Sequence, residues 1–115
     1  MSDYTTSYKI AYQTPSIQQQ IEVAVVTAAG QIINEDPATP DHANRLAWAN
    51  WAIANSSVAW VAFRWPVANN PAIRAACVAD PSGQSVLDSD VQFVVNANLQ
   101  QVVDEWVVSN AKTPV

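Results

Sequence analysis

The chain has 115 residues, of which 13% are charged and 50% are hydrophobic, and its formal net charge at pH 7 is −5. This length fits one domain with one core, and the acidic balance disfavours nucleic-acid binding, which needs a basic surface. In ordinary soluble domains roughly a quarter of the residues are charged, and a monomer of this size buries only about two-thirds of its unfolded surface. We therefore expect neighbouring subunits to cover part of the apolar surface.

The first fourteen residues are predicted to form an extended arm. Tyr4, Tyr8 and Tyr12 recur at intervals of four, so their rings would lie on one side if the segment became helical. Three tyrosines and Ile10 are not typical of a disordered tail. We interpret the segment as an arm that docks on a partner subunit. The alternative is a strand or turn that lies on its own domain.

The first helix is predicted from Pro15 to about Glu35, because a proline at the first helical position lacks only an N–H that would be unpaired there. Apolar residues at steps of three and four form two nearly opposite faces. One face consists of Ile17, Ile21, Ala24, Val25, Ala28 and Ile32, and the other of Val23, Val26, Gly30 and Ile33. Such a helix is either central in its own fold or sandwiched between subunits.

Pro37 ends the first helix, because the residue before a proline is pushed out of the helical conformation. Thr39 is the expected cap of a second helix, which runs from about Pro40 to Asn55. The stretch Val58–Trp65 is apolar except for one arginine, and periodicity does not distinguish a buried strand from a helix there. We favour a short helix, because the chain offers no other strand to pair with. Pro66 is expected to end this segment in either case.

A third helix is predicted over Pro71–Ala79, with Cys77, the only cysteine, as a small buried hydrophobic residue. A turn over Asp80–Gly83 follows. The last helix is expected from Asp88 to about Val108, capped by Asp88 or Ser89. Its core-facing stripe consists of Val91, Val94, Val95, Leu99, Val102, Val103 and Trp106. Packing must hold this helix, because its valine content lowers its intrinsic helix propensity.

Together these elements predict an all-α fold, a small bundle of four to five helices. The expected boundaries are an N-terminal arm over residues 1–14, a helical domain over residues 15–110 and a loose C-terminal tail over residues 111–115. The sequence has neither a basic leader followed by an apolar core nor an uninterrupted apolar stretch of membrane-spanning length. We therefore expect a soluble protein that is made inside the cell.

The residue types predict no catalysis, no cofactor and no metal. His42 is the only histidine, and one histidine with one cysteine is too few for a zinc site. We interpret Asp41 as favourable to the helix dipole and His42 as a polar residue of the first turn. The two glycines lie in unrelated contexts, which disfavours a phosphate cradle. The carboxylate pairs Glu35–Asp36 and Asp104–Glu105 are interpreted as solvated groups near helix ends.

An aromatic block lies in the middle of the chain and consists of Trp48, Trp51, Trp60, Phe63 and Trp65. Tryptophan is typical of interface hot spots and of cores alike, and for any one of these rings we favour the core. The residues that we expect at a subunit interface are Tyr4, Tyr8, Tyr12, Val23, Val26, Ile33, Trp48 and Trp51.

Two segments resemble small helical proteins encoded among the structural genes of tailed bacteriophages: Ile33–Ala49 (INEDPATPDHANRLAWA) and Asp88–Leu99 (DSDVQFVVNANL). Those proteins share an acidic-Pro-x-Thr-Pro-x-His-x-x-Arg turn and helix, an aromatic block, an Asn-Pro that opens a short helix, and an Asp-(Ile or Val)-x-(Phe or Trp)-Val-Val segment. The resemblance covers roughly residues 17–108. The tyrosine-bearing arm has no counterpart in the pattern.

The resemblance implies a non-enzymatic virion component, made in the host cytoplasm. Its expected place is the neck, as a portal adaptor or head-to-tail connector that assembles into a homo-oligomeric ring. The implied partners are copies of the chain and the portal, tail or neck proteins of the same particle, without a specific nucleic acid or a membrane. A capsid-associated or tail role is an alternative, and so is a helical module that binds a host protein. A small enzyme or ligand-binding bundle that uses the aromatic block as a pocket is a third.

Overall fold

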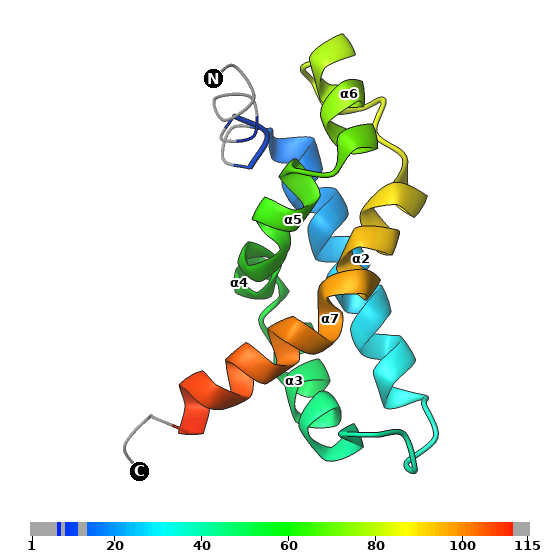
Figure 1. Cartoon of the computed structure of the whole chain (residues 1–115), viewed down its shortest axis with the longest axis vertical. Helices are drawn as coiled ribbons and strands as arrows, with labels where there is room; N and C mark the ends of the chain where they lie inside the picture. Colours follow the sequence, from blue (N-terminus) through cyan, green and yellow to red (C-terminus); the bar gives the residue numbers. More distant parts are fainter. Residues whose placement is uncertain (1–6, 8, 12–13, 112–115) are drawn as a thin grey trace.

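The structure, a computed structural model, describes residue 7, residues 9–11 and residues 14–111. The described residues contain helices and no strand, which confirms the all-α prediction (Figure 1). The helices are α2 (Pro15–Ile33), α3 (His42–Ala54), α4 (Ser56–Ala59), α5 (Arg64–Ala68), α6 (Pro71–Ala79) and α7 (Asp88–Ala111), with a 3-10 helix, η1 (Trp60–Phe63), between α4 and α5.

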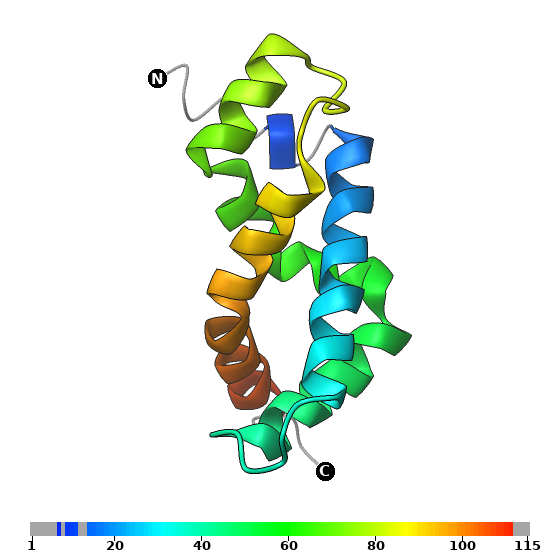
Figure 2. The same ribbon diagram turned by 90° about the vertical axis from the view of Figure 1, so that its right-hand side faces the viewer.

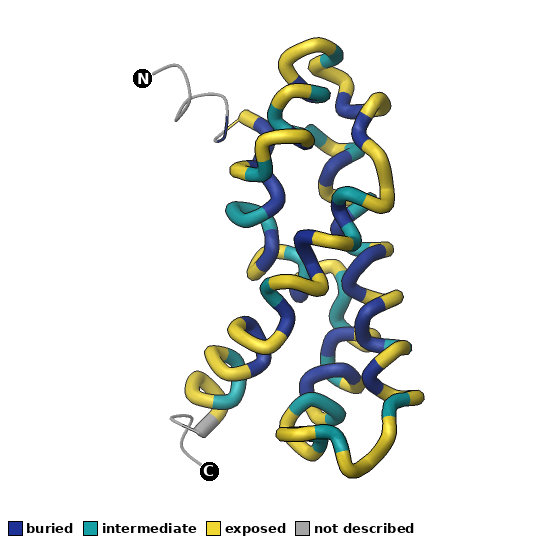
Figure 3. The backbone as a smooth tube through the Cα atoms, turned by 45° about the vertical axis from the view of Figure 1, so that its right-hand side comes forward, coloured by how far each residue is buried: buried dark blue, intermediate teal, exposed yellow. Residues whose placement is uncertain are grey.

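The two long helices, α2 and α7, form the centre of an elongated fold that measures 43 × 30 × 21 Å. α2 packs against α3, α7 and the α4–α5 segment. Helix α6 lies at one end of the molecule and the α2–α3 turn at the other (Figures 1 and 2). Buried residues follow the inward sides of the helices (Figure 3). Trp48 and Phe63 are the largest fully buried side chains and contact each other edge to face, with ring centroids 6.2 Å apart.

Helix α6 has the bounds that the sequence predicts. The side-chain oxygen of Asn70 accepts hydrogen bonds from the backbone N–H groups of Ala72 (3.0 Å) and Ile73 (3.1 Å). These bonds satisfy two of the N–H groups that the start of a helix leaves unpaired. Cys77 is buried and free, as expected. Its burial raises the pKa of the thiol, so the side chain behaves as a small hydrophobic group.

Helix α3 begins at His42, so the prediction that Thr39 caps a helix opening at Pro40 is wrong. Asp41 occupies the cap position with φ of +63°, in the left-handed region that aspartate adopts more readily than most residues. Its side chain makes no cap hydrogen bond. The residues before it form turns instead, in which the N–H of His42 donates to the carbonyl oxygen of Thr39 at 3.0 Å.

The stretch Val58–Trp65 is helical, as favoured, but it is divided among α4, η1 and α5. This division raises the number of helices above the four to five expected. Pro66 does not end the segment, because α5 continues to Ala68. Proline is the third residue of α5, and the first N–H groups of a helix have no intrahelical acceptor, so its missing N–H is tolerated there.

Helix α7 begins at Asp88, so Leu87 takes the cap position that we expected Asp88 or Ser89 to occupy. The carbonyl oxygen of Leu87 accepts hydrogen bonds from the N–H groups of Asp90 (3.1 Å) and Val91 (3.3 Å). The predicted stripe is buried from Val91 to Val103, and Trp106 is partly buried against it. The helix continues beyond Val108 to Ala111, which is the only described residue of the predicted tail.

The described part of the predicted arm is helical and lies on its own chain. Residues 7 and 9–11 have helical backbone, and Ile10 and Ala11 are buried in the core. Ser7 is also buried, and its hydroxyl donates a hydrogen bond to Asn69 Oδ1 at 2.9 Å. An extended arm that docks on a partner is therefore wrong for these residues, because their apolar side chains complete the core of the same chain. Tyr4, Tyr8 and Tyr12 lie outside the described residues.

Candidate functional site

A groove lies between α3, the α4–η1 segment and the C-terminal part of α7, and it has a volume of about 340 Å³. We call it the tryptophan groove. Its lining residues are Trp48, Trp51, Val58, Ala59, Val61, Ala62, Val102, Glu105, Trp106 and Ser109. All of them are apolar except Glu105 and Ser109, which both come from α7. An apolar hollow with few polar groups is typical of a binding surface.

Two tryptophans from distant parts of the chain contact each other in this groove. The ring centroids of Trp51 on α3 and Trp106 on α7 lie 5.7 Å apart at an interplanar angle of 39°. Both rings are partly buried and pack against the core. Val58 and Val61 on the opposite wall are exposed, Val58 by 58%. The groove therefore offers large apolar side chains that a partner can contact without rearrangement of the core.

A second apolar surface lies on the outer face of α2, where Val23, Val26, Gly30 and Ile33 lie together and Glu22 lies one helical turn before Val26. The opposite face of α2 is buried in the core as predicted. Val23 is 67% exposed, and Val26 and Ile33 are also exposed. A Cβ built on Gly30 would meet no atom of the described chain within 4 Å. The described part of the chain thus leaves this face uncovered.

The structure separates the expected interface residues into three groups. Val23, Val26 and Ile33 share the exposed outer face of α2, and Trp51 lines the tryptophan groove. Trp48 also lines the groove, but it is only 1% exposed and packs in the core, so a partner could reach little of its ring. The three tyrosines lie outside the described residues. Sequence reasoning did not assign Trp106, Val58 or Val61 to a site.

A polar cluster joins the α2–α3 turn to α3. Glu35 accepts hydrogen bonds from Arg45 Nη2 at 2.8 Å and Nε at 3.1 Å, and from His42 Nδ1 at 2.8 Å. The hydrogen bond from Arg45 is the largest cause that lowers the pKa of Glu35 from 4.5 to about 2. The Glu35 side chain is 14% exposed, so the expectation that it is a solvated group is wrong. Asp36, Asp104 and Glu105 are exposed as expected.

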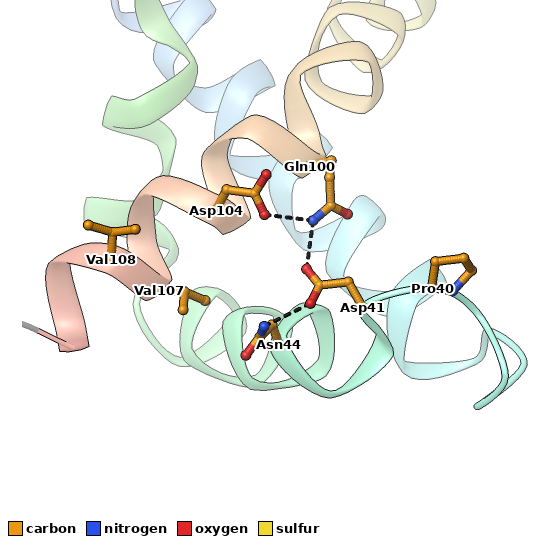
Figure 4. A pocket seen from close by; sticks show the side chains of 7 residues that line it. All are labelled: Pro40, Asp41, Asn44, Gln100, Asp104, Val107 and Val108. Carbon is orange, nitrogen blue, oxygen red and sulfur yellow. Dashed lines mark hydrogen bonds between the residues drawn. The ribbon is translucent and has the colours of Figure 1, made fainter.

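The cluster continues from α3 to α7 through Gln100 (Figure 4). Arg45 Nη1 donates to Gln100 Oε1 at 3.0 Å, and Gln100 Nε2 donates to Asp41 Oδ2 at 2.8 Å and Asp104 Oδ1 at 2.9 Å. Asp41 Oδ1 also accepts from Asn44 Nδ2 at 2.7 Å. These side chains lie beside an open hollow of about 630 Å³ that Val107 and Val108 also line. Each of these side chains forms a hydrogen bond with another side chain of the cluster, which is typical of a network that stabilises the fold.

The part of the chain that the structure describes contains no cluster suited to a metal ion. No three or more of its His, Cys, Asp and Glu side chains are placed to hold one metal ion. Among the described helices, none combines the length and apolarity that a membrane crossing requires. No protein-family model, curated protein or solved structure matches the chain. The resemblance to small helical proteins of tailed bacteriophages therefore stays a prediction.

Proposed function

We propose that the chain is a non-enzymatic structural subunit of a tailed-phage virion. In this proposal, copies of the chain form a homo-oligomeric ring in the neck, as a portal adaptor or head-to-tail connector, after synthesis in the host cytoplasm. The portal and the tail or neck proteins of the same particle are its partners. The resemblance of Ile33–Ala49 and Asp88–Leu99 to phage structural proteins supports this placement.

The observation that carries the proposal is the presence of apolar surface on two different sides of the molecule. The buried face of α2 points towards α3, α7 and the α4–η1 segment, which are the elements that form the tryptophan groove. The outer face of α2 therefore points away from α3 and the α4–η1 segment, and its Val23 lies beside the N-terminal end of α7 rather than the C-terminal part that lines the groove. A ring subunit needs two different surfaces of this kind, because a heterologous contact joins one patch on each copy to another patch on the next.

The low charge of the chain supports the same function. Only 13% of the residues are charged, and both apolar surfaces consist mostly of aliphatic or aromatic side chains. Contiguous apolar patches are typical of interaction sites, whereas single exposed hydrophobic residues are normal. Assembly would remove these patches from water.

The mass of the purified chain, measured by light scattering alone and with the portal protein of the same phage, tests the proposal. We expect a closed oligomer in solution, or one that forms when the portal is added. A chain that stays monomeric under both conditions would contradict the proposal. Mass spectrometry of purified virions should also detect the chain in a fixed ratio to the portal protein.

A helical module that binds a host protein is the second candidate function, and the tryptophan groove favours it. Tryptophan is the residue type most typical of binding hot spots. This candidate predicts a complex with a host protein and no copies of the chain in purified virions. The virion measurement therefore separates the two candidates.

A further inference from the structure

The two halves of α7 are attached to different parts of the fold. In the N-terminal half, Val95 is fully buried, and Gln92 Nε2 donates a hydrogen bond to the carbonyl oxygen of Ala24 on α2 at 3.1 Å. In the C-terminal half, Trp106 contacts Trp51 on α3. The helix changes direction along its length, between the part that lies on α2 and the part that lies on α3 (Figures 1 and 2).

The bend in α7 has a local cause at Asn98, which lies between these two attachments. Asn98 Nδ2 donates to the carbonyl oxygen of Val94 at 2.8 Å. In a regular helix that oxygen accepts the backbone N–H of the residue four positions on, so side chain and backbone compete for one acceptor. A side chain that enters the hydrogen-bond ladder in this way bends a helix. Asn98 is therefore a pivot about which the C-terminal half can swing.

The C-terminal half of α7 lies between two hollows. One side of it lines the open hollow of Figure 4, and the other side lines the tryptophan groove. The first side consists of Gln100, Asp104, Val107 and Val108, and the second of Val102, Glu105, Trp106 and Ser109. Successive helical residues are about 100° apart, so positions 100 and 102 point in nearly opposite directions. A swing of this half therefore narrows one hollow and widens the other.

Two hydrogen bonds hold α7 on the side of the open hollow, and we call them the latch. Gln100 Oε1 accepts from Arg45 Nη1 at 3.0 Å, and Gln100 Nε2 donates to Asp41 Oδ2 at 2.8 Å (Figure 4). Arg45 is itself fixed by its ion pair with Glu35 in the α2–α3 turn. The latch thus joins α7 to the start of α3, on the side away from the tryptophan groove.

Asp41 has an unfavourable backbone conformation at the latch. Its φ is +63°, and its side chain makes no cap hydrogen bond to the start of α3. The left-handed conformation destabilises a residue other than glycine, and it persists where the surrounding structure fixes it. The carboxylate of Asp41 accepts hydrogen bonds from Gln100 and Asn44 instead. The latch therefore gives a reason for this conformation that helix capping does not.

The apolar side of α7 opposes the latch. Val58 and Val61 on the far wall of the tryptophan groove are exposed, and Trp51 and Trp106 are only partly buried. Movement of α7 towards this wall would remove apolar surface from water, which is favourable in proportion to the area covered. Two opposed effects thus set the position of α7: the latch bonds on one side and the burial of apolar surface on the other.

We propose that the latch holds the tryptophan groove open. With Gln100 bonded to Asp41 and Arg45, the C-terminal half of α7 stands away from the α4–η1 segment and the groove is accessible. With the latch broken, this half swings about Asn98 towards the α4–η1 segment and the groove narrows. This inference goes beyond the proposed function, because it concerns how a single chain keeps the groove open, whichever partner the groove serves.

Two variants break the latch in different ways. Gln100→Ala removes both latch bonds. Asp41→Gly removes one of them and also relieves the backbone strain, because glycine adopts a positive φ readily. Gln101→Ala is the matched control: Gln101 is exposed, and its side chain bonds Glu105 on the same helix at 3.3 Å. Both alanine substitutions change helix propensity equally, so a difference between them reports the latch.

The distance between nitroxide labels on cysteines at Ser57 and Asn110 measures the swing. Both positions are exposed, Ser57 on α4 and Asn110 near the end of α7. Cys77→Ser removes the only native cysteine from this background. The chain from Asn98 to Asn110 spans about 18 Å of helix, so a swing of about 10° moves the helix end by about 3 Å.

We expect Gln100→Ala to shorten the label distance by about 3 Å. Asp41→Gly should shorten it by less, because the bond from Arg45 to Gln100 remains. Gln101→Ala should leave the distance of the wild type unchanged.

Quenching of tryptophan fluorescence by acrylamide is a second readout, measured at a concentration where the chain is monomeric. Closure of the groove covers Trp51 and Trp106, so quenching should be weaker in Gln100→Ala than in the wild type and the Gln101→Ala control. A bond that only stabilises the fold would have the opposite effect, because its loss would loosen the packing around the rings and strengthen quenching.

The inference is overturned if Gln100→Ala keeps or lengthens the label distance of the wild type, or if its quenching is unchanged or stronger. Equal shortening in Gln101→Ala also overturns it, because that variant leaves the latch intact. If Gln100→Ala loses helical circular dichroism, Asp41→Gly is compared with the wild type by the same two measurements and the same criteria. These outcomes leave the ring proposal untouched, since light scattering tests it separately.

Discussion

Alanine substitution of the two glycines should change the stability of the chain in opposite directions. Gly83 has φ of +78°, a conformation in which an L side chain costs about 1–2 kcal/mol. A Cβ there would also lie 2.5 Å from Ser16 Oγ and 2.8 Å from Thr14 Cγ2. Ser16 would have to turn away and lose the hydrogen bond that it donates to the carbonyl oxygen of Ser82, which contributes about 0.5–1.5 kcal/mol.

Gly83→Ala is therefore expected to lower the free energy of unfolding by about 2–3 kcal/mol, which corresponds to roughly 10 °C in Tm for a domain of this size. Gly30→Ala should raise it by up to about 1 kcal/mol, because its Cβ enters open space. Urea unfolding followed by circular dichroism measures both changes, at a concentration where the chain is monomeric. The reasoning is refuted if Gly83→Ala changes stability by less than about 0.5 kcal/mol or if both substitutions act in the same direction.

Three further predictions follow from burial, capping and charge. Trp48→Ala should lower the free energy of unfolding by about 3–5 kcal/mol, because the ring is fully buried. Trp51→Ala should lower it by less, because that ring is only partly buried. Equal losses of stability in thermal unfolding would contradict the burial of Trp48 and the partial exposure of Trp51. Asn70→Ala should cost about 1 kcal/mol in urea unfolding, because α6 loses its side-chain cap, whereas Asn70→Asp, which keeps the cap oxygen, should retain most of the stability. The folded state lowers the pKa of Glu35 from 4.5 to about 2, so this carboxylate contributes stability that is present above pH 4.5 and is lost as the pH falls towards 2. Glu35→Gln should therefore be less stable than the wild type at neutral pH, and the difference should shrink over this range; a difference that does not change with pH would count against the ion pair.

Helix ends are predictable where neighbouring residues alone decide them. Asn70 and the proline after it set the start of α6, because the cap and the fixed φ act within a few residues. Thr39 and its following proline give a similar signal, yet α3 begins at His42. The residues before α3 form turns instead, and the carboxylate of Asp41 accepts a hydrogen bond from Gln100 on α7. Periodicity and capping rules do not include a contact between residues so far apart in the chain.

The candidate site was predictable only in part, for a related reason. The spacing of Val23, Val26 and Ile33 places them on one side of α2, and because the opposite side is buried, these three residues face outward. The second helix is apolar around much of its circumference, so spacing does not predict which of Trp48 and Trp51 is buried. Their burial depends on where η1 and α7 pack: Phe63 covers Trp48, and Trp106 contacts Trp51 at the groove. The groove therefore becomes visible only when three distant segments are placed together.

The distribution of exposed apolar side chains matters more for assembly than their number. Phe93 on α7 is exposed, but the residues one helical turn away on its face are Ser89, Asp90, Asn96 and Ala97. A single hydrophobic side chain among polar neighbours is normal on a monomer surface and requires no partner. The outer face of α2 and the tryptophan groove differ because their apolar side chains are contiguous. A low content of charged residues thus predicts that part of the apolar surface is covered by a partner. The places where exposed apolar side chains lie next to one another indicate which part that is.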